Sequence, residues 1–370
     1  MIGSMYAIVP PSLPLYHTPD VLISAHFPLG PGPDTMQTEL FDAQMLAPLV
    51  QYLDRNGARA EAFLDRAHIP GELITGGGWV TKKQAYNFTY DIVKRSRFPG
   101  AIFTAYLDFQ FDHLGPVAQA MKACKTVKEA LEVGTKLGSA AYEGNEYFLK
   151  TEDATTWFCF REPKVIAEGQ TFINDMTLTV YYHLIRAVTE EDWRPEKMCF
   201  RRELVERHQT VERFEDCHAT IHPAYSAIAF PTEFLSRRSP WQNHSSTQKK
   251  TWSVNTEESE PVIERISRLL SSQFPYRKFP LLEETANIFD VSPATLKREL
   301  KSVGTTYRQL LDRLRFDIAC DMLSDPQLTI RDIALELGYS GANNFVRSFH
   351  RMTGLSPGRY RRHQRRADSE

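Results

Sequence analysis

Residues 293–301 carry side chains that could form hydrogen bonds with a patterned, anionic partner. If this stretch forms a helix, helical spacing exposes four residues on one side: Ala294, Lys297, Arg298 and Lys301. Arginine can donate two parallel hydrogen bonds to O6 and N7 of guanine, and both Arg and Lys can contact backbone phosphates. This face therefore favours contact with duplex DNA.

A second stretch, residues 342–350, has a comparable face. Its expected exposed residues are Ala342, Asn343, Val346, Arg347 and His350. Asparagine can bind N6 and N7 of adenine in the same bidentate manner that arginine uses for guanine. A solvated polar surface on an all-helical domain is the plainer interpretation of either face taken alone.

The two stretches belong to copies of one pattern, which argues against that plainer interpretation. Residues 285–292 match residues 333–340 at an offset of 48, and each copy places a tight turn between two short helices. Gly338 supplies the positive φ that a sharp turn needs, and Asp290 takes the equivalent place because Asp tolerates that conformation better than most side chains. The repeat predicts paired helix-turn-helix units.

Apolar residues recur at helical spacing behind both faces and between the two units. The expected buried stripes are Leu296, Leu300 and Val303 in the first unit, and Phe345, Phe349 and Met352 in the second. Residues 306–323 have the spacing of one long helix, which would span about 27 Å at 1.5 Å per residue. Because successive major-groove faces lie ~34 Å apart, one chain could place both units in adjacent turns of DNA.

Charge is uneven along the chain. The whole chain has 44 basic and 46 acidic residues, a net charge of −2, which argues against a sequence-independent architectural DNA protein. Residues 281–370 contain 14 Lys and Arg against 12 Asp and Glu, a balance of +2. Between Arg347 and Arg366 there are seven arginines and no acidic residue, so this run is either a solvated cationic tail or a set of phosphate contacts.

The region before this domain mixes helical and strand patterns. Helices are expected from Leu40 to Leu53, from Ala60 to Ala67, after a capping box formed by Thr126 and Glu129, and from Phe172 to Val188. Strands are expected at Tyr147–Lys150, Thr155–Phe160, Lys197–Arg201 and Ala227–Phe230.

Composition marks the domain boundaries. Residues 1–33 hold seven prolines, which resist helix formation, and residues 239–260 are polar and poor in apolar side chains. We expect an irregular arm at 1–36, a mixed α/β domain at 37–238, a linker at 239–260 and an all-α domain at 261–370 with units at about 281–302 and 329–352.

Neither enzyme chemistry nor a metal site is indicated. The five cysteines are scattered and lack C-x-x-C spacing, which favours reduced thiols over a disulfide framework. Cys217, His218 and His222 form the one cluster that resembles metal ligands, and its ordinary neighbours favour no metal. No apolar run approaches ~18 residues, so no membrane span is expected. We therefore expect no catalytic residues, no cofactor and no metal.

The C-terminal region from about residue 258 to 366 resembles the AraC/XylS family of transcription regulators. The motif residues are Gly338-Tyr339-Ser340, Phe345-x-Arg347-x-Phe349, Gly354-Leu355-Ser356-Pro357, Tyr360-Arg361, and Arg315, Ala319 and Leu323 on the long helix. The first unit departs from the family pattern, because Asp290 replaces the usual turn glycine and Thr285 replaces an aliphatic residue.

Residues from about 46 to 240 look like the sensing domain of ornithine-utilisation-type members of this family. The residues that carry this likeness are Cys124-x-Thr126-x-x-Glu129-Ala130-Leu131 and Ala229-Phe230-Pro231-Thr232-Glu233-Phe234-Leu235. The resemblance implies effector binding and self-association. Candidate effector-binding aromatics are Phe103, Tyr106, Phe109, Trp157, Tyr181 and Tyr182, and ordinary core packing is the alternative for each.

Together these features predict an α+β fold: a mixed α/β sensing domain followed by an all-α domain with two helix-turn-helix units joined by a long helix. The expected function is a cytoplasmic, effector-responsive transcription activator that binds double-stranded promoter DNA as a homodimer and contacts RNA polymerase. A repressor of the same family and a DNA-repair enzyme fused to this DNA-binding domain are the alternatives. The effector, the operator and the oligomeric state stay open.

Overall fold

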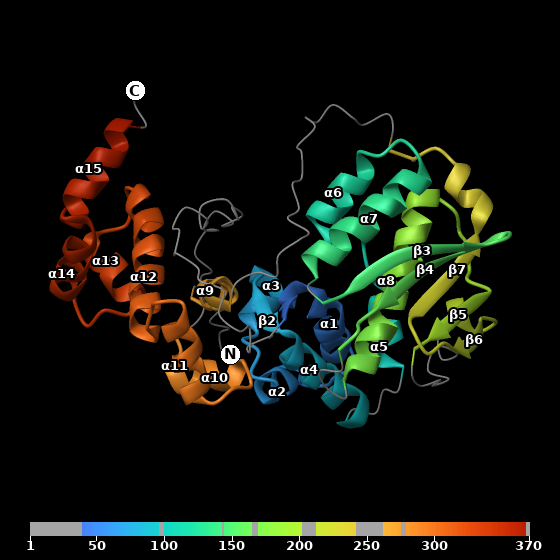
Figure 1. Ribbon diagram of the computed structural model, residues 1–370, viewed down its shortest axis with the longest axis horizontal. Helices are drawn as coiled ribbons and strands as arrows, with labels where there is room; N and C mark the ends of the chain where they lie inside the picture. The colour runs from blue at the N-terminus through green and yellow to red at the C-terminus, as the bar shows by residue number, and fades with distance from the viewer. Residues whose placement is uncertain are drawn as a thin grey trace, which may run out of the picture. The chain divides into compact units, whose positions relative to one another are not determined.

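The computed structural model describes residues 39–95, 100–142, 144–164, 169–201, 212–241, 262–274 and 279–367 (Figure 1). Contacts divide these residues into two compact units, one up to Glu299 and one from Leu300. The expected Pro-rich arm and all but the first three residues of the expected linker lie outside the described residues. Within the described ranges, no helix is both long and apolar enough to cross a bilayer.

The N-terminal unit begins with a helical layer and a short strand pair. Its elements are β1 Leu40–Asp42, α1 Ala47–Arg55, α2 Ala60–Arg66, α3 Glu72–Gly76, β2 Trp79–Thr81, α4 Lys82–Arg95 and α5 Ala101–Ala105, and β1 pairs with β2 in antiparallel fashion. The expected helix from Ala60 is confirmed as α2. The expected helix start at Leu40 is wrong, because Asp42 Oδ1 accepts a hydrogen bond from the Gln44 amide at 2.9 Å and opens a 3-10 turn before α1.

A five-stranded sheet forms the second layer, in the order β3-β4-β7-β5-β6. The strands are β3 Glu146–Glu152, β4 Thr155–Arg161, β5 Lys197–Phe200, β6 His218–Ile221 and β7 Ser226–Pro231. All neighbours are antiparallel except β5 and β6. The four expected strands are confirmed. The edge strand β6 was not predicted, because its four residues are mostly exposed and show no apolar alternation.

Helices α6 Pro116–Lys122, α7 Val127–Ala141 and α8 Gln170–Thr189 lie in the same part of this unit as the sheet (Figure 1). Apolar residues of α7 and α8, including Leu131 and Ile185, share one buried cluster with Phe158 and Phe160 of β4. Since side chains alternate across a strand, these two helices cover the sheet face to which Phe158 and Phe160 point. The expected long helix from Phe172 is thus confirmed as α8.

The helix start at Thr126 follows the predicted cap with one change. Thr126 Oγ1 accepts a hydrogen bond from the Glu129 amide at 3.1 Å, which satisfies one free donor of α7. The Glu129 carboxylate accepts from the amide of Lys125 at 2.8 Å, one residue before the cap. The reciprocal half of the capping box is therefore shifted by one residue.

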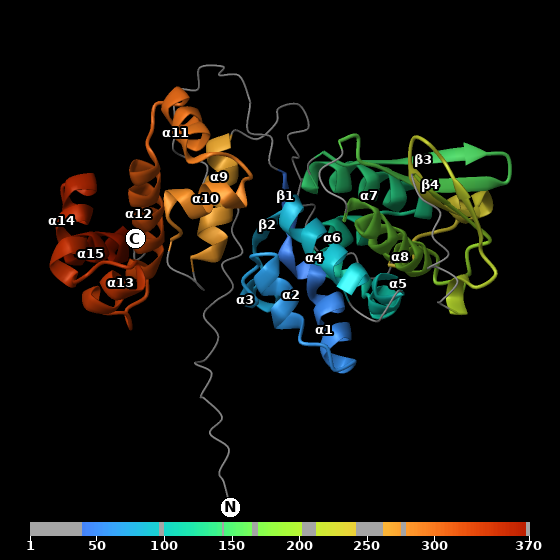
Figure 2. The same ribbon diagram turned by 90° about the horizontal axis from the view of Figure 1, so that it is seen from below.

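The C-terminal third of the chain is helical. Its helices are α9 Val262–Gln273, α10 Leu282–Ile288, α11 Pro293–Ser302, α12 Tyr307–Ser324, α13 Ile330–Glu336, α14 Ala342–Thr353 and α15 Pro357–Ala367. The predicted connecting helix is confirmed as α12, which has 18 residues. In the unit from Leu300 onward, α12 packs against α13, α14 and α15 (Figure 2). Most of the arginine run lies within helix α15, and no helix was predicted there from the sequence.

Candidate nucleic-acid interface

The two tight turns have the same backbone conformation although their residues differ. Asp290 has φ 56° and Gly338 has φ 75°, both in the left-handed region. In each copy, the amide that follows the turn residue donates to the carbonyl of the buried alanine, Ala286 or Ala334, at 2.9 Å. The prediction that Asp290 takes the place of a turn glycine is confirmed.

Helix α11 separates an apolar side from a polar side. Ser292 Oγ accepts a hydrogen bond from the Thr295 amide at 3.0 Å, so Ser292 caps the helix. Leu296 and Leu300 are buried, and Val303, just after the helix, is half-buried. All four predicted contact residues are exposed: Ala294, Lys297, Arg298 and Lys301.

Helix α14 shows the same separation. Phe345 and Phe349 are buried, whereas the predicted contact residues Asn343, Arg347 and His350 are exposed and Ala342 and Val346 are half-buried. Met352 was expected in the buried stripe, and this is wrong because its side chain is 41% exposed. The rings of Phe316 and Tyr360, from α12 and α15, lie against Phe349 instead, with centroid distances of 5.2 and 5.3 Å.

A short chain of hydrogen bonds holds the Arg347 guanidinium. Arg347 Nη2 donates to Asn344 Oδ1 at 2.5 Å, and Asn344 Nδ2 donates to Ser340 Oγ at 2.6 Å. Asn344 was not among the predicted contact residues. The three-residue spacing from Asn344 to Arg347 was the signal, because residues three and four apart are neighbours on a helix.

The side chains of the arginine run differ in their surroundings: one is bound to backbone carbonyls, whereas others are exposed to solvent. Arg361 donates from Nε to the carbonyl of Leu323 at 3.0 Å and from Nη2 to the carbonyl of Leu328 at 2.8 Å. It therefore ties α15 to the C-terminal end of α12, where helix carbonyls lack intrahelical partners. Arg359 and Arg362 are exposed. The phosphate-contact interpretation of the run thus fits Arg359 and Arg362 better than Arg361.

The six predicted effector-binding aromatics do not converge on one place. Phe103, Tyr181 and Tyr182 belong to the core beside the sheet, whereas Tyr106 and Phe109 belong to the core of the helical layer. Trp157 packs on the opposite side of β4, near Cys159. The Tyr106 hydroxyl donates to the carbonyl of Met45, whereas no described group bonds the hydroxyls of Tyr181 and Tyr182.

The thiols of this chain are poorly suited to nucleophilic chemistry. Burial raises the pKa of Cys217 to about 12 and that of Cys124 to about 11, and a thiol must lose its proton to react. The suspected cluster around Cys217 is dispersed, because His218 is exposed and the His222 ring stacks on Tyr225 at 3.9 Å. Across the described ranges, no group of three His, Cys, Asp or Glu side chains is arranged to hold a metal ion.

Two known protein families match separate parts of the chain. A helix-turn-helix domain family matches residues 285–363. The family described as the N-terminal, arabinose-binding domain of AraC transcription regulator matches residues 57–239. The first range contains both turns and both exposed faces, and the second contains the sheet and its covering helices.

Individual relatives match shorter stretches. The chain is 34% identical over 139 residues to the ornithine utilization regulator of Pseudomonas aeruginosa, a match that spans 36% of this chain and 40% of that protein. It is 33% identical over 72 residues to the transcriptional activator CfaD of Escherichia coli, which covers 20% of this chain and 27% of CfaD. The crystal structure of the regulator CdpR from Pseudomonas aeruginosa aligns with 86% of this chain and 98% of its own, at a TM-score of 0.40 and 20% identity.

An α/β domain followed by two helix-turn-helix units defines a class of transcription regulators rather than of enzymes. The matched families and relatives are all of that class. The chain therefore has an AraC-type combination of parts, an arabinose-binding N-terminal domain followed by a helix-turn-helix domain.

Proposed function

We propose that this protein is a sequence-specific DNA-binding transcription regulator that contacts promoter DNA through α11 and α14. The observation that carries the proposal is the duplication of one turn and one exposed cationic face, centred on Asp290 and Gly338. A single polar helix face would be ordinary surface. Two copies with the same backbone conformation and the same division of buried and exposed residues are what paired recognition helices require.

The exposed side chains divide by the part of DNA that each suits. Arg347 and Asn343 can form bidentate hydrogen bonds with guanine and adenine edges in the major groove. Lys297 and Lys301 are flexible point charges that suit phosphates. Phosphate contact releases counterions, so we expect affinity to fall steeply as the salt concentration rises.

Footprinting with the full-length protein on fragments of its source genome tests this function. A protected sequence that recurs in several fragments is expected, with binding at least about a thousandfold weaker to unrelated DNA at equal salt. Protein that binds every duplex with equal affinity, or none, contradicts the proposal. Lys297→Ala should lower the slope of log affinity against log salt by about one, with base preference unchanged.

We further propose that residues 57–239 bind a small molecule and drive homodimerisation in the cytoplasm, and that the bound dimer recruits RNA polymerase as an activator. The family match to an arabinose-binding domain supports the small-molecule part, and the CfaD name supports activation. In vitro transcription from a footprinted promoter distinguishes activation from repression by the sign of the change. Sedimentation of the full-length chain measures its oligomeric state.

A further inference from the structure

Helix α9 is covered on nearly all sides although it is rich in polar residues. Of its twelve residues, all of them described, only Glu264 is exposed. One side of the helix carries buried apolar residues: Ile263, Ile266 and Leu270. The opposite side carries Arg265, Arg268 and Ser272, none of which is exposed. An amphipathic surface helix leaves its polar side in water, so a second surface must cover this side of α9.

The covering surface is strand β2 of the helical layer, which comprises α1 to α5 with β1 and β2. Helix α9 packs against β2, and Ser272 Oγ accepts a hydrogen bond from the Trp79 amide at 3.0 Å. The Arg268 guanidinium lies over the Trp79 ring, with Cζ 4.5 Å from the ring centroid. Arg268 and Ser272 are four residues apart and so are neighbours on one helix face. Because β2 belongs to a two-stranded sheet, its second edge is open to such a partner.

A glycine permits the close approach of α9 to β2. Gly78 precedes β2 with φ 145°, a conformation that favours glycine. A Cβ atom built on Gly78 would lie 3.1 Å from Ser272 Cβ and 2.6 Å from Leu73 Cδ2. Both distances are shorter than ordinary van der Waals contact, so a side chain at this position would press against both α9 and α3. The contact between β2 and α9 therefore depends on a residue without a side chain at position 78.

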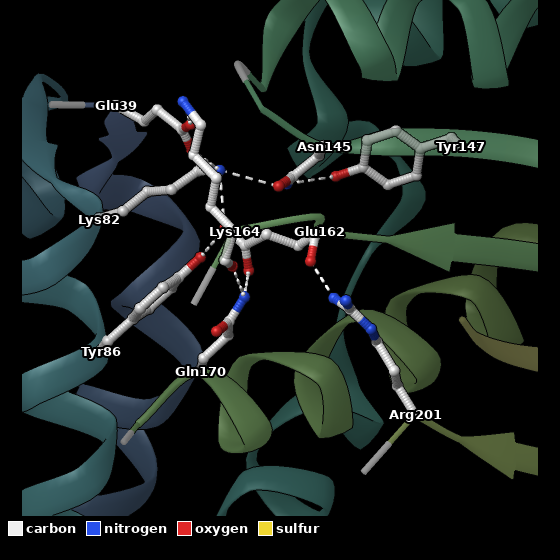
Figure 3. A network of polar contacts seen from close by, with 9 residues as sticks. All are labelled: Glu39, Lys82, Tyr86, Asn145, Tyr147, Glu162, Lys164, Gln170 and Arg201. Atoms are coloured by element: carbon white, nitrogen blue, oxygen red, sulfur yellow. Dashed lines mark hydrogen bonds and ion pairs between the residues drawn. The ribbon is translucent and has the colours of Figure 1, made fainter. Parts of the chain in front are cut away.

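The backbone that carries this surface is firmly held on its other side. Lys82, between Trp79 and Lys83 in the chain, has a side chain that is 2% exposed. Its Nζ donates to Glu39 Oε2 at 2.5 Å and to Glu162 Oε1 at 2.9 Å (Figure 3). Removing one partner from a buried ion pair is strongly destabilising, so this attachment resists displacement. Trp79 and Lys83 thus project from a fixed junction of β2 and α4.

Two further contacts connect this surface and α9 to the first helix-turn-helix unit. Phe274, just after α9, stacks on Phe279, just before α10, with a centroid distance of 4.9 Å. Lys83 Nζ lies 2.5 Å from Oδ2 of Asp290, the residue in the turn between α10 and α11. Residues up to Glu299 accordingly belong to one compact unit, and the division from the next unit falls within α11. Most of the first helix-turn-helix unit therefore shares a compact unit with the helical layer.

We propose that the surface formed by Gly78, Trp79 and Lys83 is the docking site of the first helix-turn-helix unit, and that α10 and α11 keep their DNA-binding geometry only while α9 is seated on it. The first unit needs this support because Asp290 has a strained φ and only half of a capping box begins α10. The contact residues of α11 stay exposed in the docked state, so docking supports DNA binding and does not block it. The inference rests on the proposed DNA contact of α11 and adds that the helical layer controls it.

Ser272→Ala and Trp79→Leu weaken the docking contact, and Ser267→Ala is their matched control. Ser272→Ala removes the acceptor of the Trp79 amide, whereas Trp79→Leu removes the ring under Arg268 and keeps an apolar side chain. The Ser267 hydroxyl donates to the carbonyl of Ile263 at 2.7 Å within α9, about 140° around the helix from Ser272. The control therefore removes a serine hydroxyl from α9 without changing the contact with β2.

Lys83→Glu tests the docking site from the side of the helical layer. Its side chain is 38% exposed, so the substitution leaves the core intact and places a negative charge beside Asp290. Asp290→Asn in the same chain removes the repulsion and keeps a residue that tolerates the left-handed turn. We expect exchange of α11 to be about threefold faster in Lys83→Glu and to return most of the way to the parent rate in the double variant.

Hydrogen exchange of the full-length chain, read by mass spectrometry, measures the docking. We expect amides of α10 and α11 to exchange about three- to tenfold faster in Ser272→Ala and Trp79→Leu, and within about twofold of the parent rate in Ser267→Ala. Exchange of α13 and α14 should not change in any variant. Unchanged exchange of α10 and α11 in Ser272→Ala and Lys83→Glu, or equal acceleration in α13 and α14, overturns the proposal. These two variants decide the outcome if Trp79→Leu also loosens α1.

Footprints of the same proteins on the parent's DNA site connect docking to DNA contact. The protected bases that Arg298→Ala weakens are those bound by α11. We expect Ser272→Ala to weaken protection of these bases more than protection of the bases bound by α14, with Ser267→Ala behaving as the parent. Equal weakening of both parts overturns the control of α11 by the helical layer. A parent chain that binds no DNA refutes the proposed function, whereas the exchange rates of α10 and α11 still decide whether α9 docks on β2.

Discussion

The two helix-turn-helix units reach the same backbone from different residues. The second unit places Gly338 in the left-handed turn, where no Cβ is strained, whereas the first unit places Asp290 there at φ 56°. Thr329 caps the first helix of the second unit, but the equivalent capping residue of the first unit is Leu281, which has no side-chain acceptor. The duplicated pattern therefore fixes the backbone geometry of both units, while the local stability differs between the copies.

The arginines at equivalent places on α11 and α14 also differ. Arg347 is held by the neutral amide of Asn344, so its full charge remains available. Arg298 lies 3.6 Å from the carboxylate of Glu299, which is 9% exposed and offsets part of the charge. A preoriented arginine loses less side-chain entropy on binding a base. The second unit is therefore expected to contribute more to base reading than the first.

The largest effect expected from this difference is in DNA affinity. Arg347→Ala should weaken binding to the footprinted site by about 1–3 kcal/mol and relax preference at one base pair. Arg298→Ala should cost less, because Glu299 already offsets part of its charge. Fluorescence anisotropy on the parent site and on singly changed sites measures both quantities.

Asn344→Ala is the control for the preoriented arginine. It leaves Arg347 in place but removes the amide that holds it. The DNA affinity of Asn344→Ala should therefore lie between that of the parent and that of Arg347→Ala. Equal losses of affinity from Arg298→Ala and Arg347→Ala would show that the two units read bases to the same extent, which contradicts the expected difference between them.

The turn residues give the next largest effect. Nothing lies within 4 Å of a Cβ built on Gly338, so Gly338→Ala meets no steric clash and its cost is conformational, about 1–2 kcal/mol. Gly338→Asp, which transfers the first unit's residue, should cost less than alanine because Asp tolerates this conformation better. Hydrogen exchange of the peptide around the turn in the full-length chain measures the local change.

Asp290→Gly completes this exchange of residues. Glycine relieves the strained φ but removes the ion pair between Asp290 and Lys83, which is exposed and worth at most about 1 kcal/mol. The two effects oppose each other, so the free energy of unfolding should change by at most about 0.5 kcal/mol. A cost for Asp290→Gly that matches the cost of Gly338→Ala would refute the view that Asp290 is only a tolerated substitute.

The helix-turn-helix units could be predicted from sequence because their determinants are local. The left-handed turn depends on one residue, and the division of α14 into two faces follows from helical spacing around Phe345 and Phe349. The role of Arg361 could not be predicted, because its partners are the carbonyls of Leu323 and Leu328, which reach it only through tertiary packing. From its composition, the arginine run could be either a solvated tail or a set of phosphate contacts, and neither alternative gave Arg361 a structural role.

A buried cluster of charged side chains around Lys82, in the N-terminal unit (Figure 3), could not be predicted from sequence for a related reason. Lys82 and Gln84 open α4 with polar side chains that are buried, which breaks the apolar periodicity that identifies an amphipathic helix. The hydrogen-bond partners of Lys82 are Glu39, just before β1, Asn145, just before β3, and Glu162, just after β4. No spacing along the chain relates these positions, so only the folded structure brings them together.

The smallest expected effect concerns the first helix of each unit. In the second unit Thr329 Oγ1 accepts from the Asp332 amide and the Asp332 carboxylate accepts from the Thr329 amide, each at 3.1 Å, which completes a capping box. In the first unit the carboxylate of Glu284 accepts from the Leu281 amide at 2.7 Å, so only half of the box is present. Leu281 is also 66% exposed, so its side chain contributes little burial.

Leu281→Thr should therefore stabilise α10 by about 0.5–1 kcal/mol, and Thr329→Ala should destabilise α13 by about the same amount. Hydrogen bonds from Thr329 lower the pKa of Asp332, so its contribution is present above the ordinary carboxyl pKa and is lost as the pH falls through the lowered value. Thr329→Ala should weaken this acid sensitivity, because alanine loses the hydroxyl hydrogen bond to Asp332 and keeps the amide one. Leu281→Thr should leave the acid sensitivity unchanged. Exchange protection of α10 and α13, followed as the pH falls in the full-length chain, measures both; equal protection of α10 in parent and Leu281→Thr would mean that the missing cap is not what separates the two units.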